Sequence, residues 1–212
     1  EKRNIPFFPR GFPWKYRKES YSEVYKENKN EVSCINGLVL NDPDIDAVTR
    51  LTNRIEVMGM KDDLKNFALE PGTWTSFNNQ NTIIPRKIIP SYFTPPATGR
   101  NSDIWTSFFM CKLFEIHENL LVFGEPIVRQ DRNPHNIWND LNLELKNNLL
   151  TDQFVDLLKS LKIKKMKSHL ETAIEMCIQA KEKTKNLEVS DNDKKYINDF
   201  FEEYLMWTDC FR

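Results

Sequence analysis

The chain of 212 residues lacks most of the short motifs by which enzymes are recognised. It has no GxSxG motif, no glycine-rich phosphate loop of the P-loop type and no GxGxxG, which argues against a serine hydrolase, a P-loop nucleotidase and a dinucleotide-binding fold. No run of eighteen apolar residues occurs, so the sequence predicts no membrane-spanning segment. It has four cysteines without a CxxC pair, a pattern that fits neither a disulfide framework nor a zinc site: Cys34, Cys111, Cys177 and Cys210.

An excess of charge of either sign is also missing. Lysine and arginine number 30 against 31 aspartates and glutamates, which argues against a nucleic-acid-binding protein. The aromatic content of 12 % and the hydrophobic content of 40 % predict a folded globular chain of about one domain. Reduced thiols indicate a cytoplasmic protein. Because the chain starts without methionine, we expect a piece of a longer protein, and a membrane anchor elsewhere in that parent would instead indicate the Golgi.

The first 130 residues mix β-prone and polar segments. Residues 32–40 predict a strand, and residues 47–51 predict the start of a helix or a short strand, with Asp44 or Asp46 as a cap. Residues 54–69 predict an exposed connection. Residues 120–123 predict a short buried strand that ends at Gly124 and Pro126.

Helical patterns dominate the rest. Residues 103–119 predict a helix that is buried nearly all round, with Ser102 or Asp103 as its N-cap. Residues 141–161, 166–185 and 191–207 predict three more helices, the last capped within residues 190–193. Two apolar stripes support them: Leu149, Leu150, Phe154, Leu157, Leu158 and Leu161 in the first, and Ile197, Phe200, Phe201, Tyr204 and Leu205 in the last. We therefore predict an α/β portion in residues 1–138 and an all-helical C-terminal extension in residues 139–212.

The polar, proline-broken stretch of residues 71–103 is the strongest candidate for a binding site. Four consecutive amides, Asn78, Asn79, Gln80 and Asn81, both donate and accept hydrogen bonds and so suit sugar hydroxyls, although a polar turn would need the same residues. Asp103 follows at the start of the buried helix. There it can act as a general base toward a sugar hydroxyl, or simply as an N-cap.

Two further charged clusters are candidates. Asp42, Asp44 and Asp46 form a DxD pattern that suits a divalent cation, with a turn and its capping aspartates as the alternative. Arg129, Asp131, Arg132 and His135 suit the growing charge of a diphosphate leaving group, with a solvated loop as the alternative. His117 and His169 are assigned to ordinary helix positions.

Five segments, taken in order, resemble a known group of proteins: RGFPWKYR, GLVLNDPDIDAVTRLT, EPGTWTSFNNQNT, GRNSDIWTSFFMCKLFEI and FGEPIVRQDRNPHN. They are similar to the STELLO-type glycosyltransferases and to the related plant reversibly glycosylated polypeptides, which are UDP-arabinopyranose mutases. The likeness covers roughly residues 8–140 and is closer to the STELLO group. It implies the acceptor-side portion of a glycosyltransferase-A-like fold, a nucleoside-diphosphate sugar as substrate, an unknown acceptor, and a divalent metal, Mn²⁺ or Mg²⁺.

The resemblance also assigns roles to single residues. Asp103 matches the family's acceptor-facing carboxylate and is the catalytic candidate, and Asn81 matches an asparagine below the sugar. Arg10 matches the arginine close to the self-glycosylation site of the plant mutases. Asp44 and Asp46 match the PDxDA aspartates. The substrate-binding candidates are Arg10, Asn78, Asn79, Asn81, Arg100, Arg129 and Arg132.

Two departures from the family pattern qualify these assignments. The nucleotide-binding half with its acidic metal-binding run would lie upstream of the segment RGFP and is missing from this chain. Gln130 stands where the mutases have a histidine, so His135 becomes the metal candidate. With these departures, the resemblance still implies a glycosyltransferase. The alternatives are a non-catalytic interaction module for a partner enzyme or a second copy, and a nucleotide-sugar mutase.

Overall fold

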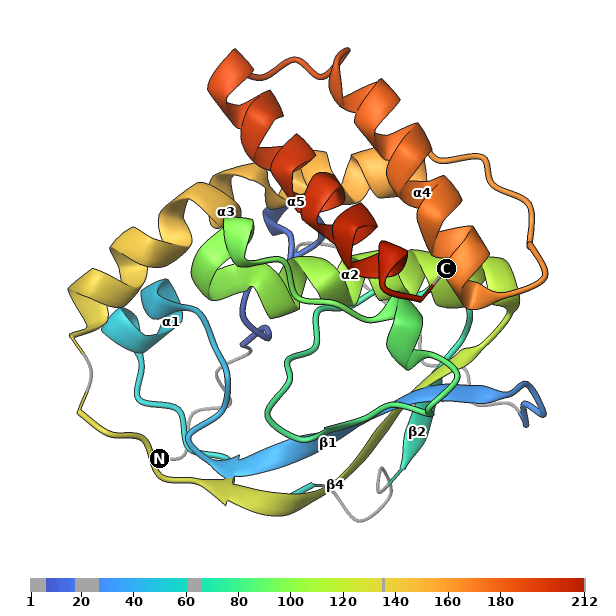
Figure 1. Ribbon diagram of the computed structural model, residues 1–212. Coiled ribbons are helices and arrows are strands. Elements are labelled where there is room, and N and C mark those ends of the chain that lie inside the picture. Colours follow the sequence, from blue (N-terminus) through green and yellow to red (C-terminus); the bar gives the residue numbers. More distant parts are fainter. Residues whose placement is uncertain (1–6, 18–26, 61–65, 135, 212) are drawn as a thin grey trace.

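The computed structural model describes residues 7–17, 27–60, 66–134 and 136–211. These residues form a mixed α/β fold with all the long helices on one side of a four-stranded sheet (Figure 1). The elements are β1 (Val32–Asn41), α1 (Ala47–Thr52), β2 (Phe67–Leu69), β3 (Thr82–Ile83), α2 (Ser102–His117), β4 (Leu120–Gln130), α3 (Ile137–Lys159), α4 (His169–Thr184) and α5 (Asp191–Asp209). The predicted α/β class is thus confirmed.

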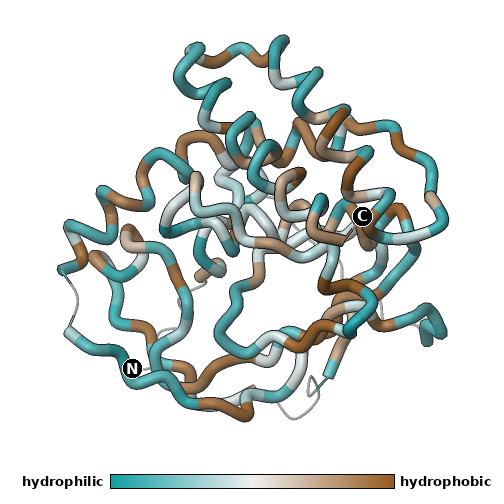
Figure 2. The backbone as a smooth tube through the Cα atoms, viewed as in Figure 1, coloured by the Kyte–Doolittle hydropathy of each residue, from teal (hydrophilic) through white to brown (hydrophobic). Residues whose placement is uncertain are grey.

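The sheet has the strand order β2-β4-β1-β3. The two long strands β1 and β4 are parallel, and the short edge strands β2 and β3 pair antiparallel to them. Parallel neighbours need a crossover connection, and α2 lies within it. Figure 2 shows hydrophobic runs along β1 and β4, in keeping with strands that are covered by a helix.

The prediction that the last strand ends at Gly124 and Pro126 is wrong, because β4 continues to Gln130. Gly37 pairs with Gly124 and Val39 pairs with Val128, with a register shift between the two pairs. Only one residue separates the first members of these pairs, whereas three separate their partners. The bulge takes up the extra residues, so the strand passes a proline without losing its later pairing.

Helix α2 is the centre of the core. Most of its side chains are buried, including Trp105, Phe108 and Phe109, which confirms the prediction of a helix covered nearly all round. The predicted cap is wrong: Ser102 is already the first helical residue, and Asn101 precedes it. The side-chain oxygen of Asn101 accepts a hydrogen bond from Arg10 Nη1 at 2.7 Å. A long-range contact thus decides this helix end.

The predicted C-terminal helices are confirmed as α3, α4 and α5, which lie over α2 (Figure 1). Ser190 caps α5 and accepts a hydrogen bond from the Asp193 backbone N–H at 3.2 Å, as predicted. Leu149 does not belong to the core stripe, since it is 66 % exposed, whereas the other predicted members on α3 are buried. Buried side chains of α2, the sheet and these helices form one hydrophobic cluster, so the extension packs directly on the α/β portion.

For residues 47–51, between β1 and β2, the sequence allowed the start of a helix or a short strand, and the structure shows a helix. Residues 47–52 are a helix, α1, and Asp46 caps it by accepting from the Thr49 backbone N–H at 2.8 Å. The connection predicted for residues 54–69 is only partly correct, because Val57 bridges to Asn41 and the segment ends in β2. Among the described helices none is both long and apolar enough to cross a membrane.

Candidate functional site

A cavity of about 630 Å³ opens beside the sheet, bordered by β1, β2, β4 and the coil segments 7–12, 43–45, 57–60 and 73–80. This volume lies within the usual range for small-molecule sites. Much of the wall is aromatic: Phe7, Phe12, Phe67, Trp74, Phe77 and Phe123 contribute to it. The central polar stretch of the sequence, residues 71–103, therefore does supply one wall of a cavity, through residues 73–80.

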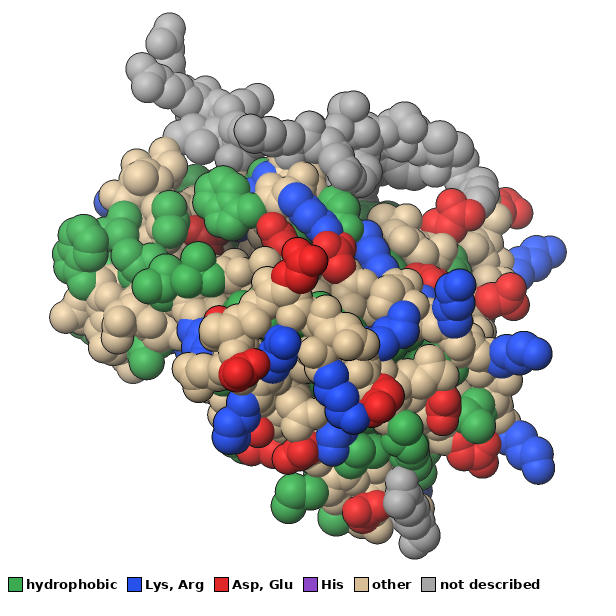
Figure 3. All heavy atoms as spheres, turned by 90° about the horizontal axis from the view of Figure 1, so that it is seen from above, with side chains coloured by type: hydrophobic (Ala, Val, Ile, Leu, Met, Phe, Trp, Pro, Cys, Tyr) green, Lys and Arg blue, Asp and Glu red, His purple; other side chains and the backbone are tan. Residues whose placement is uncertain are grey.

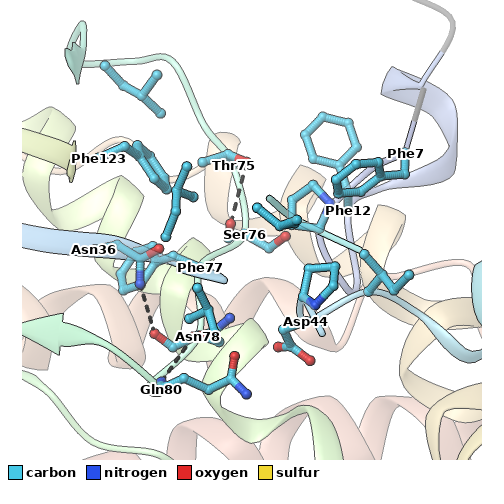
Figure 4. A pocket seen from close by; sticks show the side chains of 18 of the residues that line it. Phe7, Phe12, Asn36, Asp44, Thr75, Ser76, Phe77, Asn78, Gln80 and Phe123 are labelled. Atoms are coloured by element: carbon cyan, nitrogen blue, oxygen red, sulfur yellow. Dashed lines mark hydrogen bonds between the residues drawn. The ribbon is translucent and has the colours of Figure 1, made fainter. Parts of the chain in front are cut away.

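Part of the polar lining lies together at one end of the cavity. Figure 4 shows the carboxylate of Asp44 and the side chains of Asn78 and Gln80 on the same side of the cavity. Asn36, from β1, donates through Nδ2 to the Asn78 carbonyl at 3.1 Å, and Asn78 Oδ1 accepts from the Gln80 backbone N–H at 2.9 Å. The amide-rich loop is thus a hydrogen-bonded turn and a cavity wall at the same time.

The four amides of this loop do not share one environment. Asn78 and Gln80 line the cavity. Asn79 accepts a hydrogen bond from the Tyr92 hydroxyl through Oδ1. Asn81 lies against β1, where its Nδ2 donates to the Leu38 carbonyl at 3.3 Å. Asn79 and Asn81 are therefore tied to other parts of the chain, and they are not among the described residues that line the cavity.

Arg10 is the hub of the charged groups beside the cavity. Its Nε lies 3.0 Å from Asp44 Oδ1, its Nη2 lies 3.0 Å from Asp103 Oδ2, and its Nη1 donates to the Arg100 carbonyl at 2.7 Å. The residue is only 7 % exposed. Burial by itself lowers the pKa of Arg10, but the two carboxylates raise it above its usual range, so the guanidinium stays charged.

Asp103 and Asp44 therefore flank one arginine, and they differ in what else they meet. Asp44 lines the cavity, whereas Asp103 is not among the described lining residues. Both Asp103 oxygens accept from Arg10 Nη2, and Oδ1 also accepts from the Ile104 backbone N–H at 2.9 Å. Burial raises the pKa of Asp103, and Arg10 opposes that shift. The carboxylate that faces the cavity is thus Asp44, which the sequence analysis assigned to a turn or a metal site in the segment NDPDIDA.

Arg132 lies next to this pair. Its Nη2 is 3.6 Å from Asp44 Oδ1 and its Nε is 3.3 Å from Asp42 Oδ2. With Arg50 and Arg54 it lines a second, polar hollow of about 400 Å³. The two hollows share the turn that leads out of β1, since Ile45 lines both. An anionic group in the second hollow would lie beside a ligand in the first.

The other two predicted arginines lie elsewhere. Arg100 forms ion pairs with Asp140 at 3.3 Å and Glu144 at 3.0 Å, both on α3. It therefore joins the helical extension to the start of α2. Arg129 pairs with Asp131 at 3.1 Å, and both side chains are more than half exposed. That solvated pair matches the alternative that the sequence left open for this loop.

The three aspartates of residues 42–46 do not fit a divalent cation. Asp42 meets Arg50 and Arg132, Asp44 meets Arg10, and Asp46 caps α1 and pairs with Arg17 at 3.2 Å. Their oxygens already face cations or backbone N–H groups, which favours the turn-and-cap alternative. His135, the metal candidate, lies outside the described residues.

Neither a search of protein-family models nor a search of curated proteins finds a match for this chain. The geometry supplies a ring-lined space, a carboxylate held by arginine and two amides at one end, and a polar hollow with three arginines next to it. In such an arrangement the carboxylate and amides can hold a ligand hydroxyl, and the arginines of the neighbouring hollow can stabilise negative charge that develops close to it.

Proposed function

We propose that the chain is the acceptor-side portion of a glycosyltransferase-A-like enzyme that uses a nucleoside-diphosphate sugar. One observation carries the proposal: Asp44, Asn78 and Gln80 meet at one end of a cavity whose walls are largely aromatic. A carboxylate and amides can hold an acceptor hydroxyl, and aromatic rings cover the apolar parts of a ligand. The resemblance to STELLO-type glycosyltransferases points to the same chemistry.

The transfer can be written with these groups in place. The acceptor hydroxyl oxygen bonds to the anomeric carbon, the bond from that carbon to the diphosphate breaks, and the nucleoside diphosphate leaves with the electron pair. The hydroxyl proton passes to a carboxylate, and Asp44 supplies it in this proposal because it faces the cavity. Asp103, the sequence candidate for this role, then acts through Arg10, which both carboxylates share.

The leaving diphosphate would lie in the second hollow. Arg50, Arg54 and Arg132 line it, and guanidinium groups bind phosphate oxygens with paired hydrogen bonds. The proposal includes Mn²⁺ or Mg²⁺, which would neutralise charge on the diphosphate. Since the aspartates of residues 42–46 are engaged with arginines, other ligands would have to hold that ion.

The test is transfer from labelled sugar nucleotides by the complete protein. Asp44→Asn is expected to lower kcat by about 100-fold or more, in the range of a lost general base. The control is Asp199→Asn on α5, whose carboxylate pairs with Lys195 at 2.6 Å, and it should leave transfer unchanged. Transfer at the wild-type rate by Asp44→Asn would sink the assignment.

Asp103→Asn separates a positioning role from a catalytic one. If Asp103 acts through Arg10, the variant should shift the pH profile of kcat while the KM for the donor stays near the wild-type value. Asp103→Glu, which keeps the charge, should restore most of the profile. If Asp103→Asn instead matches the loss seen in Asp44→Asn, the base assignment returns to Asp103.

A second candidate is a non-catalytic module that binds a partner enzyme or a second copy. One observation favours it: Trp138, Leu145 and Leu149 are exposed at spacings of seven and four, so they share one face of α3. Figure 3 shows hydrophobic side chains gathered on one side of the helical face. Exposed apolar clusters often mark interaction sites.

A thermal-shift titration separates these candidates. A sugar nucleotide with Mn²⁺ at 100 times its Kd would add about 2.7 kcal/mol to stability. If UDP and GDP sugars give no shift in a protein that includes the upstream part, and Leu149→Asp abolishes self-association or partner binding, the interaction module is favoured. A nucleotide-sugar mutase would show the shift too, and only an altered sugar ring in the product would identify it.

A further inference from the structure

We infer that the cavity selects an acceptor whose bulk is apolar and that presents a hydroxyl group, such as an aromatic or alicyclic alcohol. The glycosylation of that hydroxyl rests on the proposed function, whereas the class of ligand that binds rests on the cavity alone. The apolar wall is the first observation. Besides six aromatic side chains, it includes Leu38 from β1, Val57 and Met60 from the coil segment 57–60, and Leu69 from β2.

The second observation is that some of the polar groups in this wall are already committed to hydrogen bonds within the chain. The Asn36 amide nitrogen already donates to the Asn78 carbonyl and to Thr82 Oγ1. Asn78 Oδ1 already accepts from the Gln80 backbone, and both Asp44 oxygens accept from Arg10 Nε. A free polyol in this cavity would lose its hydrogen bonds to water against a wall that is mostly apolar, which makes its binding unfavourable.

Asp44 and Ser76 can still serve a ligand hydroxyl. Asp44 keeps lone pairs besides those used by Arg10, since each carboxylate oxygen accepts more than one hydrogen bond. Ser76 is 2 % exposed in the same wall, and its Oγ has no hydrogen-bond partner among the described residues. A ligand hydroxyl near this end would satisfy a buried polar group that otherwise has none.

The size of the space agrees with this class. A cavity of about 630 Å³ holds a ligand of several fused or linked rings, or a branched hydrocarbon of similar bulk. Aromatic side chains favour flat rings, which stack or meet them edge-on. In the transfer reaction the acceptor would place its hydroxyl at Asp44, its oxygen would bond to the anomeric carbon, and the proton would pass to Asp44 as the nucleoside diphosphate leaves.

Binding of a simple probe tests the inference without any donor. We expect the full chain to bind 2-naphthol in a calorimetric titration, and to bind naphthalene about fivefold more weakly, because naphthalene has no hydroxyl. Leu69→Phe enlarges a side chain in the wall and should weaken 2-naphthol binding about tenfold. Leu143→Phe, the same substitution at a half-exposed position on α3, should leave the affinity unchanged.

If Leu69→Phe unfolds below the temperature of the titration, Leu38→Phe serves as a second variant in which the cavity is blocked. The inference is overturned if 2-naphthol shows no saturable binding, if a folded blocked variant binds as the wild type does, or if naphthalene binds equally well. These results are independent of the transfer assay. If 2-naphthol binds but Asp44→Asn transfers sugar at the wild-type rate, the proposed function alone is wrong. If 2-naphthol does not bind but Asp44→Asn loses transfer, only this inference is wrong.

Discussion

Asn81 lies directly against Gly37, where a Cβ atom would come within 2.1 Å of Asn81 Nδ2 and 2.8 Å of its Cγ. The Gly37 backbone N–H also donates to the Asn81 carbonyl at 2.8 Å. The amide-rich loop is therefore held to β1 at a position where only glycine leaves enough room. This contact fixes the loop from which Asn78 and Gln80 reach the cavity.

Gly37→Ala is expected to lower the free energy of unfolding by about 1–2 kcal/mol, because the new methyl group must displace the Asn81 side chain and its hydrogen bond to Leu38. Urea denaturation measures the loss. Gly59→Ala, where no atom lies within 4 Å of the added Cβ, should stay within about 0.5 kcal/mol. In an Asn81→Ala background the cost of Gly37→Ala should fall by more than half, and an unchanged cost would contradict the contact.

Arg10→Met should destabilise the chain by about 3 kcal/mol or more, since it leaves Asp44 and Asp103 without their shared cation in a buried setting. The matched control is Arg129→Met. Its ion pair with Asp131 is 60 % and 73 % exposed, so its loss should cost less than about 0.5 kcal/mol. Equal unfolding midpoints for the two variants would show that the Arg10 ion pairs do not stabilise the fold.

Because His117 and His169 are packed against each other in the fold, we expect the chain to lose stability at acid pH. Their rings stack with centroids 4.0 Å apart where the end of α2 meets the start of α4, and His117 Nε2 lies 2.8 Å from Thr172 Oγ1. Burial, together with the nearby His169, Lys165 and Lys87, lowers the pKa of His117 from 6.5 to about 4. Burial also lowers the pKa of His169.

Below pH 6.5 the unfolded chain therefore binds more protons than the folded one, so the stabilisation is complete above about pH 6.5 and is lost as the pH falls toward 4. The loss from His117 should reach at most about 3 kcal/mol. Urea titrations between pH 7 and 5 should show it before most carboxylates protonate. His117→Gln, which cannot titrate, should flatten this dependence, and parallel curves for variant and wild type would contradict the prediction.

Local sequence patterns predicted much of the fold because the forces behind them are local. The β-prone run that became β1, the helical periods of α3 to α5 and the Ser190 cap each depend on neighbours within a few residues. The extension of β4 beyond Pro126 could not be predicted in this way. It depends on a bulge that forms only against β1, which lies far away in the sequence.

The site was harder to predict than the fold for the same reason. Arg10 joins Asp44 and Asp103 across sequence separations of 34 and 93 residues, and that joint contact decides which carboxylate faces the cavity. The sequence marked both aspartates and the amide-rich loop as polar groups suited to a sugar. It gave no indication that Asn81 would lie against β1, since the space at Gly37 is a property of the packed sheet.

The cysteines give the last prediction. Cys34, Cys111 and Cys177 are buried and Cys210 is exposed. Burial raises the pKa of Cys111 to about 12 and raises those of Cys34 and Cys177 as well, and thiolates rather than thiols react with disulfide reagents. A thiol assay on the native chain should therefore show one fast-reacting group, and an assay in guanidinium should show all four cysteines of the sequence. Cys210→Ser should abolish the fast reaction; a second fast thiol would contradict the packing around the core cysteines, and fewer than four in guanidinium would contradict the predicted reduced state.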